Sequence, residues 1–226
     1  MKFILYSLPR TGSSCVIRSF SKSGINACLE EPFFDGSSKL VATDRLRSIA
    51  VDADRLDHIE YSKKLFEKYD GFKILSNQTM QLLDICDKNN AGLILLKRDY
   101  FSTVASLIGL LTENMGHDPS TYNTWTSSGK GMIYDPNIPF FNITLKRFLY
   151  HNYLIDNILN KSKNYVTTIQ YENPDQSKKD LENYFGKEII FDIMKPTSLD
   201  SYFINVDEFI SDIENRLRDM GFGVYI

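Results

Sequence analysis

Residues 2–20, KFILYSLPRTGSSCVIRSF, constrain the fold more strongly than any other stretch of the chain. They open with a short apolar run, FILY, of the kind that forms a buried parallel strand. Residues 7–14 follow with a proline, a glycine and several hydroxyl side chains, which favour a tight loop. Apolar residues then return at Val16, Ile17 and Phe20 with helical spacing. The stretch therefore predicts a strand, a small-residue loop and the start of a helix.

A loop of this kind is suited to binding an anion. Free backbone N–H groups and the positive end of the helix dipole point at the space before the helix. Ser13 and Ser14 are favourable N-cap residues, and Arg10 adds a permanent, forked positive charge. The loop differs from the nucleotide loop G-x-x-x-x-G-K-[ST], because only Gly12 is present and no Lys-Ser/Thr pair follows it. An ordinary surface connection is the alternative.

The composition excludes several other classes of protein. With 226 residues, the chain is long enough for one well-filled core, and we expect a single domain over residues 1–226. A net charge of −3 and a pI of about 5.7 give no general attraction to nucleic acid or to an anionic membrane. No apolar run approaches the ~20 residues of a membrane span. The run FILY is too short for the apolar core of a signal peptide.

Cysteine and histidine usage indicates neither a disulfide framework nor a metal site. Cys15, Cys28 and Cys86 are odd in number and lie far apart in the sequence. This pattern favours reduced thiols in a cytoplasmic protein. The three histidines do not combine with the cysteines in a metal-ligand spacing; they are His58, His117 and His151.

The remaining chain alternates between strand-like and helix-like segments, which predicts an α/β fold with a parallel sheet. We expect further strands at residues 24–29, 72–75, 93–96 and 165–170. Helices are expected near residues 43–56, 78–88, 101–111, 140–159, 177–185 and 206–220. A further helical stretch is expected to carry Leu65, Phe66 and Tyr69 and to end at Gly71. The expected core residues of the two long later helices are Leu145, Phe148, Leu149, Tyr153, Ile158, Phe209, Ile213 and Leu217.

Polar residues follow three of these strands, at the sheet edge where ligands of parallel sheets bind. Glu30 and Glu31 follow residues 24–29, although a solvated acidic pair at a turn is the commoner fate of such a dipeptide. Arg98 follows residues 93–96 and is followed eight positions later by Ser106 in a helix. Tyr171 follows residues 165–170, where a core tyrosine is an equally fair interpretation.

These motifs together resemble the sulfotransferases that use 3′-phosphoadenosine 5′-phosphosulfate (PAPS). PRTGSS matches the phosphosulfate loop P-[KR]-[ST]-G-[ST]-[ST] of that family, position by position. The Arg98–Ser106 spacing resembles its 3′-phosphate motif, and Tyr171-Glu172-Asn173 resembles its Y-E-[DN]-[LP] segment. The resemblance implies a three-layer α/β/α sandwich with a central parallel sheet, the P-loop NTPase-like sulfotransferase fold. It also implies PAPS as the cofactor, with 3′-phosphoadenosine 5′-phosphate (PAP) as product and no metal.

The resemblance also implies roles for individual residues. The 5′-phosphosulfate would be bound by Arg10, Thr11, Gly12, Ser13 and Ser14, the 3′-phosphate by Arg98 and Ser106, and Tyr171 would lie near the adenine. Arg10 would stabilise the leaving phosphate, and Lys73 would neutralise the sulfuryl oxygens.

The choice of catalytic base separates two branches of the family. The cytosolic branch has a His two positions after a strand Lys, and Leu75 occupies that place here, two positions after Lys73. CLEEP instead resembles the G-E-E segment of the protein-tyrosine branch. Glu31, 21 positions after Arg10, falls where its base lies. We therefore prefer Glu31 over Glu30 and over His58 as the general base.

Two other classes of function stay open. One is a non-catalytic nucleotide-binding or interaction module on the same fold. The other is a P-loop nucleotide kinase, which would need a lysine in the loop and a strand-end aspartate for Mg²⁺. The acceptor of the sulfuryl group, a hydroxyl or an amine, is not identified by any motif. Residues 112–140, rich in Gly, Pro, Ser and Asn, are either an acceptor-side loop or lid or a surface insertion.

Overall fold

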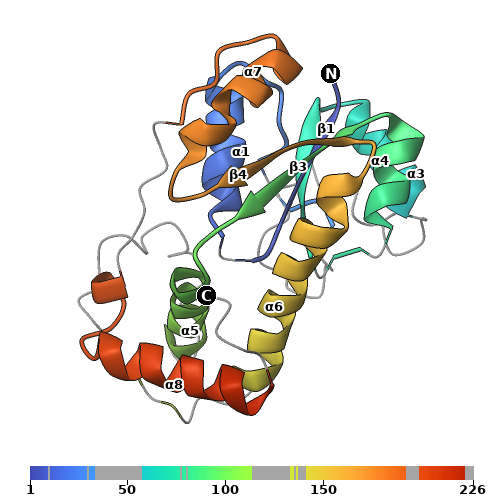
Figure 1. Cartoon of the computed structure of the whole chain (residues 1–226). Helices are drawn as coiled ribbons and strands as arrows, with labels where there is room; N and C mark the ends of the chain where they lie inside the picture. The colour runs from blue at the N-terminus through green and yellow to red at the C-terminus, as the bar shows by residue number, and fades with distance from the viewer. Residues whose placement is uncertain are drawn as a thin grey trace. The chain divides into compact units, whose positions relative to one another are not determined.

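The computed structural model describes residues 1–9, 11–29, 31–33, 58–76, 78–79, 81–113, 133–134, 136, 141–191 and 199–221. Two compact units divide the chain. The first unit comprises Met1–Lys97 and His151–Lys195, and the second comprises Arg98–Tyr150 and Pro196–Ile226. Figure 1 labels most of the helices and strands of both units.

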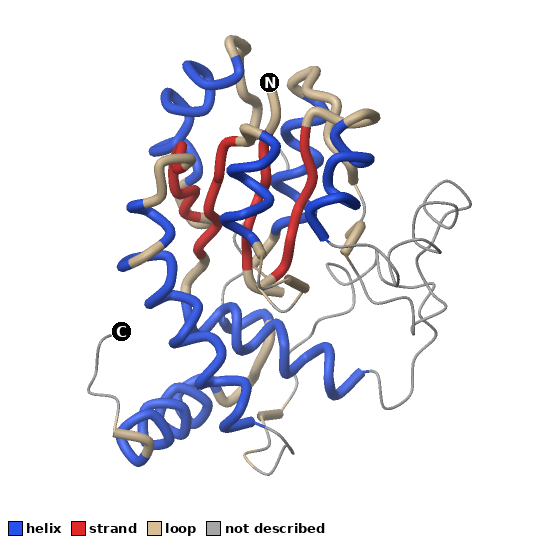
Figure 2. Tube along the Cα trace, turned by 90° about the vertical axis from the view of Figure 1, so that its right-hand side faces the viewer, coloured by secondary structure: helices blue, strands red, loops and turns tan. Residues whose placement is uncertain are grey.

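A parallel sheet forms the centre of the first unit. Its strands are β1 (Phe3–Ser7), β2 (Gly71–Leu75), β3 (Gly92–Lys97) and β4 (Tyr165–Gln170), in the order β2-β1-β3-β4. All three pairings are parallel. Figure 2 shows the strands in red, side by side, with helices packed around them. The predicted α/β class and the parallel sheet are therefore confirmed.

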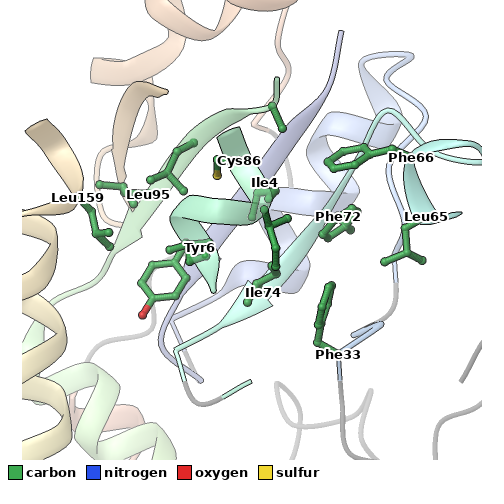
Figure 3. Packing of buried hydrophobic residues seen from close by; sticks show 14 of the residues in the cluster. Ile4, Tyr6, Phe33, Leu65, Phe66, Phe72, Ile74, Cys86, Leu95 and Leu159 are labelled. Carbon is green, nitrogen blue, oxygen red and sulfur yellow. The ribbon is translucent and has the colours of Figure 1, made fainter. Parts of the chain in front are cut away.

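Helices cover both faces of this sheet. Successive residues of a strand point to opposite sides, and all five residues of β1 are buried, so both faces need a cover. Ile4 and Tyr6 of β1 belong to a buried cluster that includes Leu65 of α3 (His58–Phe66) and Ile85 of α4 (Leu82–Asn89) (Figure 3). Phe3 and Leu5, the alternate residues of β1, belong to a second cluster. The helices that contribute to this second cluster are α1 (Ser13–Lys22) and α7 (Lys178–Phe185).

Two boundaries beside the sheet differ from the predicted ones. The predicted strand at residues 24–29 is reduced to a single parallel bridge between Ala27 and Gly71, supported by a hydrogen bond from Cys28 N–H to the Gly71 carbonyl at 2.8 Å. Gly71 was expected to end a helix, but it is the first residue of β2, and α3 already ends at Phe66. Gly71 leaves room for the ring of Phe3, since a Cβ there would lie 2.2 Å from that ring.

The second unit is helical in its described part. It contains α5 (Tyr100–Glu113), the first part of α6 (Phe141–Asn157), the short helix η4 (Leu199–Ser201) and α8 (Val206–Asp219). The ring of Tyr134 packs against Phe203 and Phe209, with centroids 5.5 and 5.1 Å away. Burial of Phe209, Ile213 and Leu217 confirms the predicted core face of α8.

The buried stripe of α6 differs from the predicted one. Leu145 and Phe148 are buried as expected, but Tyr153 is 56% exposed and Ile158 is 44% exposed. The stripe continues instead through His151 and Ile155. These positions follow Phe148 by three and seven residues and so lie on its face of the helix.

The predicted helix at residues 43–56 lies outside the described residues, as do Arg10, Glu30 and most of residues 112–140. Within the part of the chain that is described, no helix combines the length and apolar character needed to cross a membrane.

Candidate functional site

The loop after β1 leads directly into α1, as the sequence predicts, but it is capped differently. Gly12 is the N-cap residue, with φ at 85°, and α1 begins at Ser13. Ser13 and Ser14 therefore lie in the first turn and do not act as the cap. The loop is closed by Thr11, whose Oγ1 donates to the carbonyl of Leu8 at 2.8 Å. A backbone at positive φ is open to glycine and strained for most other residues.

Tyr171 is brought against this loop from the end of β4. Its backbone N–H donates to the carbonyl of Lys97 at 2.9 Å, which continues the pairing of β3 with β4 by one residue. Its ring is so close to Gly12 that a Cβ on the glycine would lie 2.0 Å from Cε2. Gly12 is thus required twice, by its backbone angle and by the tyrosine ring. The predicted loop and the predicted tyrosine are therefore neighbours.

Lys73 connects β2 to the start of α1. It lies opposite Leu5 of β1, on the face of the sheet that packs against α1, and is 2% exposed. Its Nζ donates to Ser14 Oγ at 2.8 Å and lies 3.0 Å from Glu31 Oε1. A buried ammonium group is costly unless it is paired with a charge and hydrogen-bonded. Both partners come from the candidate site.

Glu31 is the more accessible member of this ion pair, with its side chain 31% exposed. Its second oxygen, Oε2, lies 3.5 Å from Nε2 of Gln78. The structure therefore brings together three residues that the sequence places far apart and assigns to the site: Ser14, Glu31 and Lys73. The resulting group combines a carboxylate able to accept a proton with a cation held beside the first turn of α1.

Gln78 was missed by sequence reasoning, which expected it at the start of a helix over residues 78–88. The helix α4 begins only at Leu82, and Gln78 lies in the turn after β2. Its side-chain Oε1 accepts the N–H of Leu75 at 2.8 Å. The position of Gln78 could have indicated a place in the site, because polar residues just after a parallel strand lie at the edge of the sheet where ligands bind.

His58, the alternative base, is held by a different neighbour. Its Nδ1 lies 2.8 Å from Oγ1 of Thr79, and its ring meets the ring of Phe33 edge-on at 5.4 Å. Thr79 Oγ1 also accepts the N–H of Gln81 at 3.0 Å, so this threonine is fixed to the start of α4. The geometry thus links Glu31, and not His58, to Lys73.

The two residues expected to bind a 3′-phosphate belong to the second unit. Arg98 is buried, and its Nη2 donates to the hydroxyl of Tyr202 at 3.4 Å. Asp99 caps the start of α5, since its Oδ2 accepts the N–H of Ser102 at 2.7 Å. Ser106 lies one turn further along α5 and is also buried. Arg98 thus lies just before α5, and Ser106 lies in the second turn of that helix.

The chain's three cysteines, Cys15, Cys28 and Cys86, are all free thiols. Burial raises the pKa of the Cys86 thiol to about 12, so this thiol stays protonated near neutral pH. Among the described residues, no group of three or more His, Cys, Asp or Glu side chains is gathered in a way that could hold a metal ion.

Two comparisons with known proteins do not assign the chain to a family. No protein-family model matches the chain, and a search of curated proteins finds no match either.

Proposed function

We propose that this protein is a sulfotransferase of P-loop type that moves a sulfuryl group from PAPS to a hydroxyl or amine acceptor. The observation that carries the proposal is the contact of Lys73 with both Ser14 and Glu31. This contact joins the candidate phosphosulfate loop to the candidate base through one buried cation. The motif PRTGSS, with its resemblance to the family's loop, supplies the nature of the ligand.

In the proposed reaction, the acceptor oxygen or nitrogen attacks the sulfur of PAPS. The bond from sulfur to the bridging oxygen breaks, and PAP leaves with the electron pair of that bond. Glu31 accepts the proton that the acceptor loses. Arg10 and the first N–H groups of α1 stabilise the charge that develops on the leaving phosphate, and Lys73 neutralises the sulfuryl oxygens.

The remaining assignments concern the nucleotide. Arg98 and Ser106 would bind the 3′-phosphate through a guanidinium and a hydroxyl, both favourable partners for phosphate oxygens. Tyr171, whose ring already packs on Gly12, would lie near the adenine. The fold proposed to hold these groups is the three-layer sandwich of the P-loop sulfotransferases. A cytoplasmic location is part of the proposal and is compatible with the three free thiols.

The proposal is tested by transfer of labelled sulfate from PAPS to acceptors in a lysate of the host, read by mass spectrometry of the products. Glu31→Gln keeps the size of the side chain but removes the base, so we expect PAP binding to persist and transfer to be lost. Arg10→Ala should lower turnover by about 10²–10³-fold, as for the loss of one preorganised charge-stabilising donor. Arg18→Ala, an exposed arginine on α1, is the matched control and should retain turnover.

Three other results would contradict the proposal. Binding of PAP without transfer to any acceptor would favour the non-catalytic module. A response to ATP with Mg²⁺ alone would favour a nucleotide kinase. Full transfer activity in Glu31→Gln would remove Glu31 from the base position.

A further inference from the structure

Gln78 is held rigidly by the last residue of β2. Its backbone N–H donates to the carbonyl of Leu75 at 2.9 Å, and its side-chain Oε1 accepts the N–H of Leu75 at 2.8 Å. A backbone N–H can only donate a hydrogen bond, so the oxygen of the Gln78 amide must face Leu75. The NH₂ group of the amide is then directed away from Leu75. The orientation of this side chain thus follows from the backbone of the turn.

That NH₂ group faces the candidate base. Nε2 lies 3.5 Å from Oε2 of Glu31, while Lys73 Nζ lies 3.0 Å from Oε1 of the same carboxylate. Two donors thus approach different oxygens of Glu31, one from the middle of β2 and one from the turn after it. At 3.5 Å the amide contact is at the long limit for a hydrogen bond, so it is weaker than the contact of Lys73 with Oε1.

We propose that Gln78 is a positioning residue, which holds Oε2 of Glu31 so that the carboxylate keeps one orientation between Lys73 and the acceptor. This inference rests on the proposed function, in which Glu31 is the base. Each carboxylate oxygen has two lone pairs, so a donor on each oxygen still leaves sites to accept the acceptor's proton. Of the charged or titratable groups in the described part of the chain, Lys73 lies beside Oε1, and His58 contacts through Nδ1 the residue that follows Gln78, Thr79.

Two substitutions, Gln78→Glu and Gln78→Met, test this role. The new side chain keeps an oxygen to accept the N–H of Leu75, so the turn is preserved. It replaces the donor that faces Glu31 with a second negative charge, and two adjacent carboxylates disfavour each other's ionised form. Gln78→Met removes both side-chain contacts at similar size. Gln176→Glu, at an exposed glutamine, is the matched control for the added charge.

The measurement is the NMR titration of the Glu31 carboxyl carbon in the unliganded full chain, which separates Glu31 from His58. We expect Gln78→Glu to raise the titration midpoint of Glu31 relative to wild type, because the added carboxylate disfavours its ionised form. Gln176→Glu should leave it unchanged. The inference is overturned if Gln78→Met, which removes the contact without adding a charge, leaves the midpoint at its wild-type value while the variant remains folded.

A second readout links the contact to catalysis. With water as the acceptor of the sulfuryl group from PAPS, we measure the rate of PAP release as a function of pH. In Gln78→Glu, we expect the acidic limb of this pH profile to shift to higher pH by the same amount as the titration midpoint, with affinity for PAP nearly unchanged. An unmoved acidic limb in that variant would remove Gln78 from catalysis. If wild-type protein neither binds PAP nor releases it from PAPS, the proposed function fails. The titration then still decides whether Gln78 orients Glu31.

Discussion

At the scale of single residues, Gly12 determines how closely the loop and the sheet approach each other. Its φ of 85° and the ring of Tyr171, which would lie 2.0 Å from a new Cβ, both exclude a side chain. The sequence motif predicts a ligand-binding role for this glycine. The structure adds that Gly12 also shapes the loop through a packing contact.

We expect Gly12→Ala to lower the free energy of unfolding by about 2–4 kcal/mol, the sum of a left-handed backbone and an overlap with the Tyr171 ring. Gly186→Ala is the matched control, since Gly186 has φ at 65° but no atom within 4 Å of a new Cβ. It should cost only about 1 kcal/mol. Urea unfolding measures both. Equal losses in the two variants would show that the tyrosine contact does not restrict position 12.

The ion pair of Lys73 and Glu31 is asymmetric, because the lysine is buried and the carboxylate is half-exposed. Loss of the carboxylate strands a buried ammonium, whereas loss of the ammonium leaves a carboxylate that water can reach. We expect Glu31→Leu to cost about 2–3 kcal/mol of stability and Lys73→Met about 1 kcal/mol. The double variant should be more stable than Glu31→Leu alone, as urea unfolding would show. Equal costs for the single variants would contradict this reading.

At the scale of elements, α6 carries a histidine in its buried stripe. His151 is 2% exposed, and its ring lies 5.1 Å from the ring of Tyr6. Among the described residues, neither ring nitrogen has a hydrogen-bond partner. Burial, and secondarily the charge of Lys97, lowers the pKa of His151 from 6.5 to about 3. The imidazole is therefore neutral in the folded protein at neutral pH.

This histidine makes stability depend on pH. Below the unfolded pKa of 6.5, the unfolded chain binds a proton that the folded chain does not, so stability is full above pH 6.5 and falls toward pH 3. Between pH 7.5 and pH 5 the loss should be about 2 kcal/mol. His151→Phe keeps a ring against Tyr6 and should remove that part of the loss. Urea unfolding at both pH values provides the comparison, and an identical pH dependence in the variant would contradict it.

The elements also show what the sequence could and could not predict. β3 was readable because LILL is a continuous apolar run, the pattern of a strand buried on both faces. Residues 24–29, GINACL, are less uniformly apolar, and they form a single bridge, Ala27 with Gly71, flanked by backbone hydrogen bonds. This tertiary outcome is not encoded by a local pattern. The stripe of α6 was misplaced beyond Phe148, because Tyr153 and Ile158 are apolar enough to suggest burial whichever way the helix is turned.

For the candidate site as well, part could be predicted from the sequence and part could not. Sequence motifs predicted Ser14, Glu31 and Lys73 as site residues, and in the structure Lys73 contacts both of the others. Their contacts, and the role of Gln78, depend on the register of β2 beside β1 and on the turn after β2. Neither feature has a signature in the sequence, because register is determined by packing across the sheet.

At the scale of the whole molecule, the net charge of −3 offers no general attraction to anions. Any affinity for a doubly phosphorylated nucleotide must therefore come from local groups. In the proposal these are Arg10, Lys73 and the start of α1 for the 5′ side, and Arg98 with Ser106 for the 3′ side. Under the proposal, selectivity for the 3′-phosphate is the property that would separate this protein from an ordinary nucleotide-binding domain.

The most direct test is calorimetric binding of PAP and of AMP, which differ only by the 3′-phosphate, to wild-type protein and to Arg98→Ala. The account predicts that wild type binds PAP about 10- to 100-fold more tightly than AMP, as expected for a charge-assisted contact. It also predicts that Arg98→Ala loses most of this preference while its affinity for AMP is unchanged. Equal affinity of the wild-type protein for PAP and AMP, or binding of neither, would contradict the account.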